Sequence, residues 1–255
     1  MLVARKAIWS SLFFLLLSGQ FVFPAAGMSA CRVFIVCSYH PGYFWQADEI
    51  EGIKAALDGL DIIYDIYYLD SKFHQDEVWL RKKAEVCLQK IKRFKPDLVF
   101  TCDDNATKTV AKHFLRHDLP IVFLGLNGEP EEYGLVKPGH RRHPGFNVTG
   151  ILERHYYQDA TYLLQTILLA NNLQEKFLYL LTDNSFTSTK LFDFLKREKW
   201  ETPWKKKFLR QVETFAQYKR IFRQINHPGN VIFFYNLETL VDQKGNYVDV
   251  NKIIA

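Results

Sequence analysis

Cysteine is scarce in this sequence, and its scarcity removes several kinds of site from consideration. The 255 residues include four cysteines, none in a CxxC pair or at a metal-ligand spacing, so neither a zinc ribbon nor a thioredoxin-like redox pair is expected. Cys87 falls on the apolar face of a predicted helix, whereas Cys37 and Cys102 end two predicted strands. We expect buried free thiols. A Cys37–Cys102 disulfide is the alternative if these strands are neighbours and the protein reaches an oxidising compartment.

Motifs that bind nucleotides or form a nucleophile elbow are also missing. No GxGxxG, GK[ST] or GxSxG pattern occurs, so neither a phosphate-binding loop nor an α/β-hydrolase elbow is predicted. The net charge of +5 falls to +3 without Arg5 and Lys6, which is too small to indicate nucleic-acid binding. The basic and aromatic run at residues 196–210, KREKWETPWKKKFLR, is predicted to be a solvated face. We therefore expect no cofactor, no metal and no nucleic-acid partner.

The sequence has no apolar run long enough for an ordinary transmembrane helix, although its N-terminus is apolar. Residues 8–23 are mostly apolar, but there are sixteen of them and polar residues interrupt them, whereas a spanning helix needs about 20. Two bases precede this run and Pro-Ala-Ala-Gly follows it, which is typical of a cleaved signal peptide over residues 1–27. The alternative is an uncleaved membrane anchor.

Export predicts a periplasmic or other extracytoplasmic location for the mature protein. Residues 28–31, MSAC, form a weak lipobox. Cys31 is therefore either the lipidated first residue of a lipoprotein or a plain cysteine at the front of the first strand. We expect membrane contact only through the signal peptide or a lipid on Cys31.

The mature chain alternates apolar strands with amphipathic helices, which favours parallel, doubly wound α/β sheets. The last residues, VDVNKIIA, are predicted to be the first turns of another helix. Strands are predicted at residues 32–37, 62–69, 98–102, 121–126, 148–153, 177–182, 207–212 and 231–235. Helices are predicted at residues 45–60, 76–94, 105–117, 156–169, 188–200 and 215–225, with Asp104 or Asn105 as the N-cap of the third.

A long polar segment interrupts this alternation at residues 127–147, NGEPEEYGLVKPGHRRHPGFN. A connection of this length without periodicity is usually functional or marks a domain junction. It predicts a first lobe over residues 31–127, a junction and hinge crossing over 128–153, and a second lobe over 154–255. The second lobe has three clear strands and is expected to be incomplete.

Polar and aromatic residues gather where the predicted strands end. In a doubly wound sheet, ligands lie beyond the carboxyl ends of the strands. Each cluster alone could be a helix cap, but several on corresponding edges of two sheets favour a ligand site. The clusters are Ser38-Tyr39-His40, Asp103-Asp104-Asn105, Asn127, Asp183-Asn184-Ser185 and Asn236.

The first strand leads into an unusually aromatic segment, CSYHPGYFW, at residues 37–45. A turn requires the Pro-Gly pair but not the surrounding rings. Tyr39, His40 and Trp45 are candidates for hydrogen bonding and for stacking on a ligand. Tyr43 and Phe44 are instead predicted to form a hydrophobic staple at the helix start.

The motifs SYHPGYFW, PDLVFTCDDNAT, PIVFLGLNG and NVTGILE, taken in this order, resemble the substrate-binding proteins of ABC transporters. The similarity covers residues 32–236 and is greatest to an uncharacterised group placed with aromatic amino-acid binders. It implies a type I periplasmic binding-protein fold, in which two flavodoxin-like lobes joined by a hinge close on a small ligand. NVTGILE would be a crossing strand in the hinge, while the family's return crossing is missing here. The resemblance implies a cleft at Ser38, Tyr39, His40, Asp103, Asn105, Asn127, Asp183 and Asn236.

Three functions remain open from the sequence. The first is a solute receptor that delivers a small ligand to an ABC transporter permease. The second is an extracytoplasmic sensor whose closure instructs a sensor kinase, and the fold itself does not separate these two. The third, a hydrolase that uses Ser38, His40 and Asp103, is the weakest, and we expect no enzyme. Asp103 would suit an amine and a helix N-terminus a carboxylate, so an amino acid or similar zwitterion is the expected ligand.

Overall fold

The computed structural model describes residues 30–142, 146–174, 177–197, 204 and 206–254. The predicted signal peptide, residues 1–27, lies outside these ranges, and so does much of the basic run at 196–210. Cys31 is the first residue of the first strand, and its backbone N–H donates to the carbonyl of Asp61 at 2.8 Å. Within the described ranges, no helix combines the length and the apolar character that crossing a bilayer requires.

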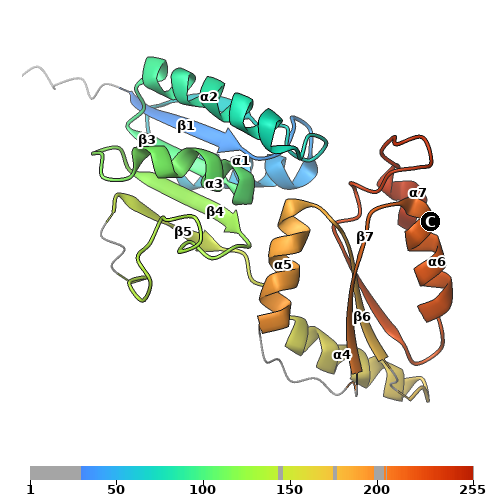
Figure 1. Cartoon of the computed structure of the whole chain (residues 1–255). Coiled ribbons are helices and arrows are strands. Elements are labelled where there is room, and N and C mark those ends of the chain that lie inside the picture. Colours follow the sequence, from blue (N-terminus) through green and yellow to red (C-terminus); the bar gives the residue numbers. More distant parts are fainter. Residues whose placement is uncertain (1–29, 143–145, 175–176, 198–203, 205, 255) are drawn as a thin grey trace, which may run out of the picture.

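The first lobe is a five-stranded parallel sheet in the order β2-β1-β3-β4-β5. This is the flavodoxin-like order, in which the chain reverses direction across the sheet between β1 and β3. Figure 1 shows the sheet with helices on both faces. The strands are β1 (Cys31–Cys37), β2 (Ile62–Tyr68), β3 (Leu98–Cys102), β4 (Ile121–Leu126) and β5 (Val148–Leu152), and the helices are α1 (Phe44–Ala56), α2 (Glu77–Phe94) and α3 (Asp103–Val110).

Two apolar layers hold this sheet together. Alternate residues of β1 point to opposite faces, so Phe34 and Val36 pack under α2 and α3, while Val33 and Ile35 pack under α1. A strand buried on both faces needs a continuous apolar sequence, which accounts for the run VFIV. The packing of this core fixes the orientation of the strands, and therefore the edge of the sheet at which their carboxyl ends lie.

Two helices differ from the sequence prediction. Helix α1 ends at Ala56 rather than at residue 60, because the chain turns at Asp58 and Gly59, which has φ +81°. Helix α3 begins at Asp103 with Cys102 as N-cap, and it tightens into a 3₁₀ turn over Ala111–Phe114. The predicted cap at Asp104 or Asn105 is therefore wrong. Asp104 instead accepts hydrogen bonds from the backbone N–H groups of Asn127 and Gly128 in the loop after β4.

The expected free thiols are confirmed, and the alternative, a Cys37–Cys102 disulfide, is not formed. Cys37 and Cys102 are direct partners on the neighbouring strands β1 and β3, and both are free and buried, as is Cys87. A hydrogen bond with Cys37, together with burial, raises the pKa of the Cys102 thiol well above its usual value. Thiolate is the form that reacts, so this environment disfavours reaction at Cys102.

The second lobe is a three-stranded parallel sheet in the order β7-β6-β8. Helix α6 covers one face, and α4 and α5 cover the other (Figure 1). Thr214 and Gln217 form a capping box that starts α6 directly after β7. The strands are β6 (Phe177–Asp183), β7 (Lys206–Val212) and β8 (Val231–Tyr235), and the helices are α4 (Tyr157–Ala170), α5 (Phe186–Arg197), α6 (Phe215–Ile225) and α7 (Val250–Ile254).

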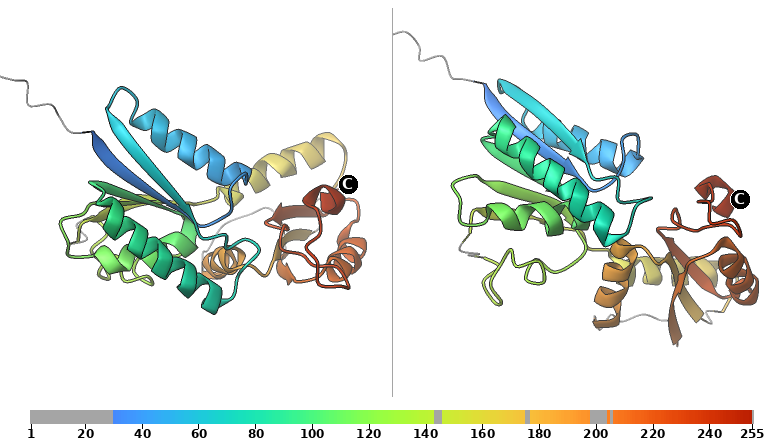
Figure 2. Two further views of the ribbon diagram at one scale, coloured as in Figure 1. Left: turned by 90° about the horizontal axis from the view of Figure 1, so that it is seen from above. Right: turned by 45° about the horizontal axis from the view of Figure 1, so that its top comes forward.

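The segment NVTGILE forms β5, the edge strand of the first sheet. Gly150 is required there, since a Cβ at this position would lie 2.3 Å from the carbonyl oxygen of Phe123 on β4. The chain then passes to the second lobe through residues 153–156, and the two lobes lie side by side in both views of Figure 2. The hinge crossing therefore follows β5, which is itself part of the first lobe.

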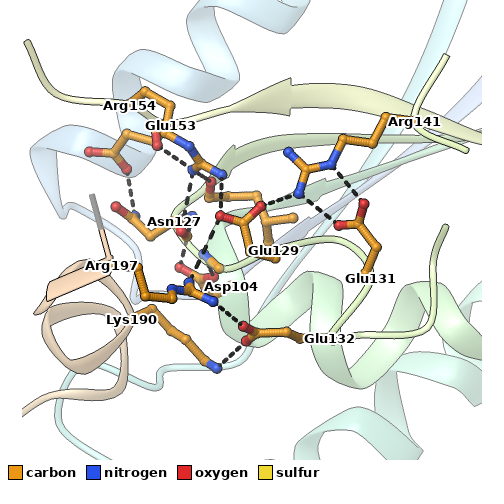
Figure 3. A network of polar contacts seen from close by, with 12 residues as sticks. Asp104, Asn127, Glu129, Glu131, Glu132, Arg141, Glu153, Arg154, Lys190 and Arg197 are labelled. Carbon is orange, nitrogen blue, oxygen red and sulfur yellow. Dashed lines mark hydrogen bonds and ion pairs between the residues drawn. The ribbon is translucent and has the colours of Figure 1, made fainter. Parts of the chain in front are cut away.

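The long polar loop between β4 and β5 packs on the first lobe and also reaches the second. Tyr133, Leu135 and Val136 are buried in the first lobe's core. Glu132, from the same loop, contacts two bases on α5, Lys190 at 2.6 Å and Arg197 at 3.3 Å. Figure 3 shows these pairs beside a second set, in which Glu129 and Glu131 contact Arg141 and Glu129 also contacts Arg154.

Candidate functional site

A cavity of about 270 Å³ lies between the two lobes, and we call it the interlobe cavity. The strand ends that line it are those of β1, β3 and β5 in the first lobe and of β8 in the second. The ends of β1, β3 and β8 lie beside the points where each sheet reverses its strand order, which is where open α/β sheets bind ligands. Its lining is Tyr39, Tyr43, Phe44, Trp45, Asp103, Glu153, His155, Thr187, Phe234, Tyr235, Asn236 and Glu238.

The first lobe contributes an aromatic wall to this cavity. The Pro-Gly turn after β1 places the rings there, with Gly42 at φ +85° and a backbone hydrogen bond from Tyr43 to His40. The rings of Tyr39 and Tyr43 pack edge to face with centroids 5.0 Å apart, and Tyr43 is the N-cap of α1. Helix α1 therefore starts at the cavity, and the sequence CSYHPGYFW is explained by a wall of rings rather than by the turn alone.

Asp103 and Glu49 form a carboxyl pair at the first-lobe side of the interlobe cavity. A Cβ on Gly125 would lie 2.8 Å from Oε1 of Glu49 and 3.2 Å from Oδ1 of Asp103, so the two carboxyls converge where that glycine leaves room. Asp103 is 1 % exposed, and its Oδ2 has no hydrogen-bond partner. Burial, followed by the charge of Glu49, raises the pKa of Asp103 well above its usual value, and burial raises the pKa of Glu49 to about 9.

Backbone strain marks two residues of the lining. Asp103 has φ +65° and Asn236 has φ +41°, in a region that residues other than glycine seldom adopt. Such conformations cost about 1–3 kcal/mol each and gather at functional sites, where the surrounding structure holds them in place. Here each one turns the chain at the end of a strand, so that a polar side chain reaches the interlobe cavity.

Glu153 joins the hinge to both lobes. Its Oε1 accepts a hydrogen bond from the hydroxyl of Tyr235 at 3.2 Å, and its Oε2 accepts one from the amide of Asn127 at 2.8 Å. Nε2 of His155 lies 3.0 Å from the same carboxylate. The hinge carboxylate therefore accepts hydrogen bonds from the residue that follows β4 and from β8, and it has a histidine of the hinge beside it.

Lys72 crosses from the first lobe to the second beside the interlobe cavity. Its side chain is 3 % exposed, and its Nζ lies 3.3 Å from Oδ1 of Asn236 and 3.4 Å from Oε2 of Glu238. The same ammonium lies over the rings of Tyr39 and Tyr43, at 4.9 Å and 4.8 Å from their centroids. One buried lysine thus links the aromatic wall of the first lobe to two polar side chains of the second.

Hydroxyl groups make further direct contacts between the lobes. The hydroxyls of Tyr39 and Thr187 are 3.1 Å apart, and the hydroxyl of Tyr43 donates to Glu238 at 3.4 Å. Farther out, Tyr247 donates to the backbone carbonyl of Phe73 at 2.7 Å. The structure therefore has the two lobes in contact around the interlobe cavity.

Some of the predicted site residues lie at the interlobe cavity. Tyr39, Trp45, Asp103 and Asn236 line it, and they come from both lobes. Asn127 is one contact away, because it donates to Glu153. The strand-end argument therefore brings residues from three distant parts of the chain to one place.

The other predicted residues do not line the interlobe cavity. The hydroxyl of Ser38 donates to the carbonyl of Cys102 and accepts from the N–H of Ala106, which ties α3 to β1. His40 stacks on Phe73, with centroids 4.7 Å apart, outside the lining.

Asn105 and Asp183 are also occupied by neighbouring groups. The amide of Asn105 donates to Ser71 at 3.0 Å. Asp183 is fully buried and accepts from the backbone N–H and hydroxyl of Ser185, the hydroxyl of Ser188 and the N–H of Thr239. Its carboxylate caps the turn into α5, so this cluster has the alternative role considered above, that of a helix cap.

Sequence reasoning missed several residues of the site. Tyr43 and Phe44 were assigned to a staple, yet both line the interlobe cavity. Glu153 and His155 directly follow β5, so the strand-end rule could have found them. Lys72, Glu49 and Glu238 carried no signal in the sequence, since a lysine or a glutamate in a loop or on a helix is usually solvated.

A larger hollow of about 710 Å³ lies beside α1 and β2. All of its lining residues belong to the first lobe, from His40 to Tyr68, so the second lobe contributes nothing to it. We place the candidate site at the interlobe cavity instead, because strained residues, a carboxyl oxygen without a partner and both lobes meet there.

Comparison with solved structures supports the fold described above. Neither the protein-family models nor the curated protein sequences give a match to this chain. Among solved structures, a conserved domain protein from Vibrio cholerae is 16% identical with a TM-score of 0.52, over 77% of this chain and 62% of that one. An ABC domain in complex with L-Trp from Streptococcus pneumoniae is 15% identical with a TM-score of 0.52, over 81% and 65%.

This chain therefore spans less than two thirds of the length of either protein. At such low identity the likeness concerns the fold alone. That fold is the type I periplasmic binding-protein fold, with two α/β lobes and parallel sheets, and the predicted fold class is confirmed.

Proposed function

We propose that this protein is an extracytoplasmic solute-binding protein that captures a small organic molecule between its two lobes. The observation that carries the proposal is the interlobe cavity, where side chains from both lobes and the hinge converge around about 270 Å³. Ligand pockets are typically about 300–1,000 Å³, so this one suits a small ligand. Closure of two lobes around a hinge is a common way to bind such molecules.

Delivery to an ABC importer is the role that we favour for the bound ligand. A fold relative is described as an ABC domain in complex with L-Trp, which supports transport of a small organic molecule. The second candidate is a sensor whose closure is transmitted to a kinase, and the contacts across the lobes suit it equally well. Measuring ligand uptake by the native host with and without the gene for this protein would separate the two roles.

A hydrolase is the least supported role. Ser38, the predicted nucleophile, is fully buried and its hydroxyl already bonds Cys102 and Ala106. Neither of these partners is a base, and His40 stacks on Phe73. A nucleophile has to lie within hydrogen-bond reach of its base, and these two side chains are used elsewhere.

The test is to identify the ligand and then to remove one wall of the interlobe cavity. Mass spectrometry of small molecules that co-purify with the protein identifies the ligand, and calorimetric titration gives its Kd. Trp45→Ala should weaken binding about 10- to 100-fold, the effect of losing an aromatic contact and its buried area. Tyr162→Ala on α4, an exposed ring outside the lining, is the matched control and should leave Kd unchanged. Equal affinities in the two variants would remove the cavity from the proposal.

A further inference from the structure

The acidic side chains around the interlobe cavity differ in how their charge is balanced. Glu238 has the ammonium of Lys72 at 3.4 Å. Glu153 accepts from Asn127 and Tyr235, as described above, and has His155 at 3.0 Å. Each of these carboxylates therefore has a basic side chain nearby, although Oε2 of Glu238 and Nε2 of His155 themselves have no hydrogen-bond partner.

The carboxyl pair Glu49–Asp103 has no such balance. Among the described residues, the amide of Gln46 is a neutral donor to the pair, and it donates to Oε2 of Glu49 at 2.7 Å. Within the described ranges, no ion pair reaches either carboxyl, and Oδ2 of Asp103 has no partner although it is buried in the lining. A buried carboxylate oxygen that lacks a partner is costly, so this atom is available for a donor that the protein does not supply.

The groups that face the pair strengthen this conclusion. They are acidic or neutral: Cys102 and Asp104 from the β3–α3 turn, Glu153 from the hinge, and the rings of Tyr39, Tyr43 and Tyr235. None is a base. Two adjacent carboxyls in such surroundings cannot both ionise, so they hold one proton between them at neutral pH. The raised pKa values of Glu49 and Asp103 agree with this geometry.

The scarcity of cationic side chains in the lining also bears on the ligand class. Among the described residues of the lining there is no lysine or arginine, and Nε2 of His155 lies 3.0 Å from Glu153. A ligand carboxylate would therefore meet rings and acids in the lining, because the ammonium of Lys72 beside the cavity already contacts Asn236 and Glu238. The first turn of α1 borders the cavity, but Tyr43 as N-cap and Phe44 and Trp45 after it present aromatic rings there.

We infer that the ligand is a small aromatic amine without a carboxylate, and that its ammonium binds Asp103 in place of the proton shared with Glu49. The inference rests on the proposed solute-binding function and names its ligand class. The rings of Tyr43, Trp45 and Phe234 supply apolar contact and cation–π attraction for such a molecule. In the described part of the chain, no group of three or more histidines, cysteines or acids is arranged to hold a metal ion.

The exchange balances in charge. One ammonium enters the interlobe cavity, and one proton leaves the carboxyl pair for the solvent. Binding therefore releases about one proton at neutral pH, and the affinity rises with pH by up to tenfold per unit until the pair ionises on its own. A zwitterionic ligand held by its carboxylate would show neither effect.

The experiment compares ligands that differ only in their charged groups. The probes are phenethylamine, L-phenylalanine and 3-phenylpropanoate, with tryptamine and L-tryptophan as a larger pair, titrated calorimetrically into the full protein. We expect each amine to bind at least tenfold more tightly than its amino acid, and the carboxylate not to bind. Titrations in phosphate and in Tris at pH 7 should give a release close to one proton.

Two variants separate the roles of the carboxyls. Asp103→Asn should weaken amine binding about 10- to 100-fold, the usual effect of losing a charged hydrogen-bond partner. Glu49→Gln should leave amine binding in place and reduce the proton release, because it removes the charge that, after burial, contributes most to keeping Asp103 protonated. Asp159→Asn, an exposed acid on α4, is the matched control. Circular dichroism and thermal melting confirm that each variant is folded.

The possible outcomes are distinct. Amino acids that bind more tightly than their amines, or a co-purified ligand that is anionic or a sugar, would overturn the ligand class and leave the proposed function standing. Amine binding without proton release in the parent protein would overturn the exchange with Glu49. If no small molecule of any class binds or co-purifies, both this inference and the solute-binding function fail.

Discussion

Lys72 offers the sharpest test of how the lobes are held together. Lys72→Met keeps the length and the apolar stem of the side chain and removes its ammonium. The change breaks the contacts to Asn236 at 3.3 Å and Glu238 at 3.4 Å, and it removes the cation from the faces of two tyrosines. The contacts to Asn236 and Glu238 join one lobe to the other, whereas the two tyrosines belong to the same lobe as Lys72. The substitution should therefore cost little stability when the lobes are separated.

The magnitude follows from the burial of the two partners. A hydrogen bond that involves a charged group contributes about 1.5–3 kcal/mol, and an exposed ion pair about 0–1 kcal/mol. Lys72 is 3 % exposed, whereas Glu238 is 22 % exposed and can be partly hydrated when the partner is lost. We expect a net loss of about 2 kcal/mol for the joined arrangement, which shifts the equilibrium between joined and separated lobes about 30-fold.

Small-angle X-ray scattering of the ligand-free protein gives the assay. Lys72→Met should increase the radius of gyration. The ligand that co-purifies with the parent protein should bind the variant about 30-fold more weakly than it binds the parent. A double-mutant cycle with Glu238→Gln should give a coupling of about 1–2 kcal/mol. Lys82→Met on α2, an exposed lysine away from the interlobe cavity, is the control. Unchanged scattering and a coupling near zero would refute the argument that Lys72 holds the lobes together.

Three further predictions concern packing, protonation and export. Gly150→Ala should lower the melting temperature by several degrees, since its Cβ would lie 2.3 Å from a carbonyl oxygen on β4, whereas Gly52→Ala, with open space in α1, should not destabilise the protein. Burial raises the pKa of Glu49 to about 9, so the folded state holds an extra proton and the free energy of unfolding should fall as pH rises from about 4 to 9. Urea denaturation across this range should show a shallower fall for Glu49→Gln, and an equal slope contradicts the assignment. Protein from the native host should begin between Met28 and Cys31 on N-terminal sequencing, and an intact N-terminus in a cytosolic fraction would rule out export.

Much of the fold could be predicted because local patterns encode it. The apolar run of β1 and the amphipathic spacing of α2 specify a buried strand and a covering helix without knowledge of their partners. The alternation of the two, repeated on both sides of a long polar segment, predicts two parallel sheets. The ends of helices were less predictable. Asp104 could have capped its own helix, but its carboxylate instead accepts hydrogen bonds from the backbone of the loop after β4.

The candidate site could be predicted only in part. The carboxyl ends of parallel strands share one edge of a sheet, which is why Tyr39, Asp103 and Asn236 were found from their sequence positions. The same rule also selected Ser38 and Asp183, which lie beneath the surface and hold turns in place. A strand-end position indicates that a residue is near the site, but it does not say in which direction the side chain points.

The sequence by itself determined the class of fold, the place of each strand and the edge at which a ligand site would form, because periodicity and chain order are local properties. Only the tertiary structure decided which charges are balanced. Glu49 lies on α1, far along the chain from Asp103, and their pairing depends on a bulge in β4 at Gly125 that leaves room for both carboxyls. Lys72 likewise reaches Glu238 only when the lobes lie side by side. Electrostatic energy depends on distance and burial, and neither is written in the order of the residues.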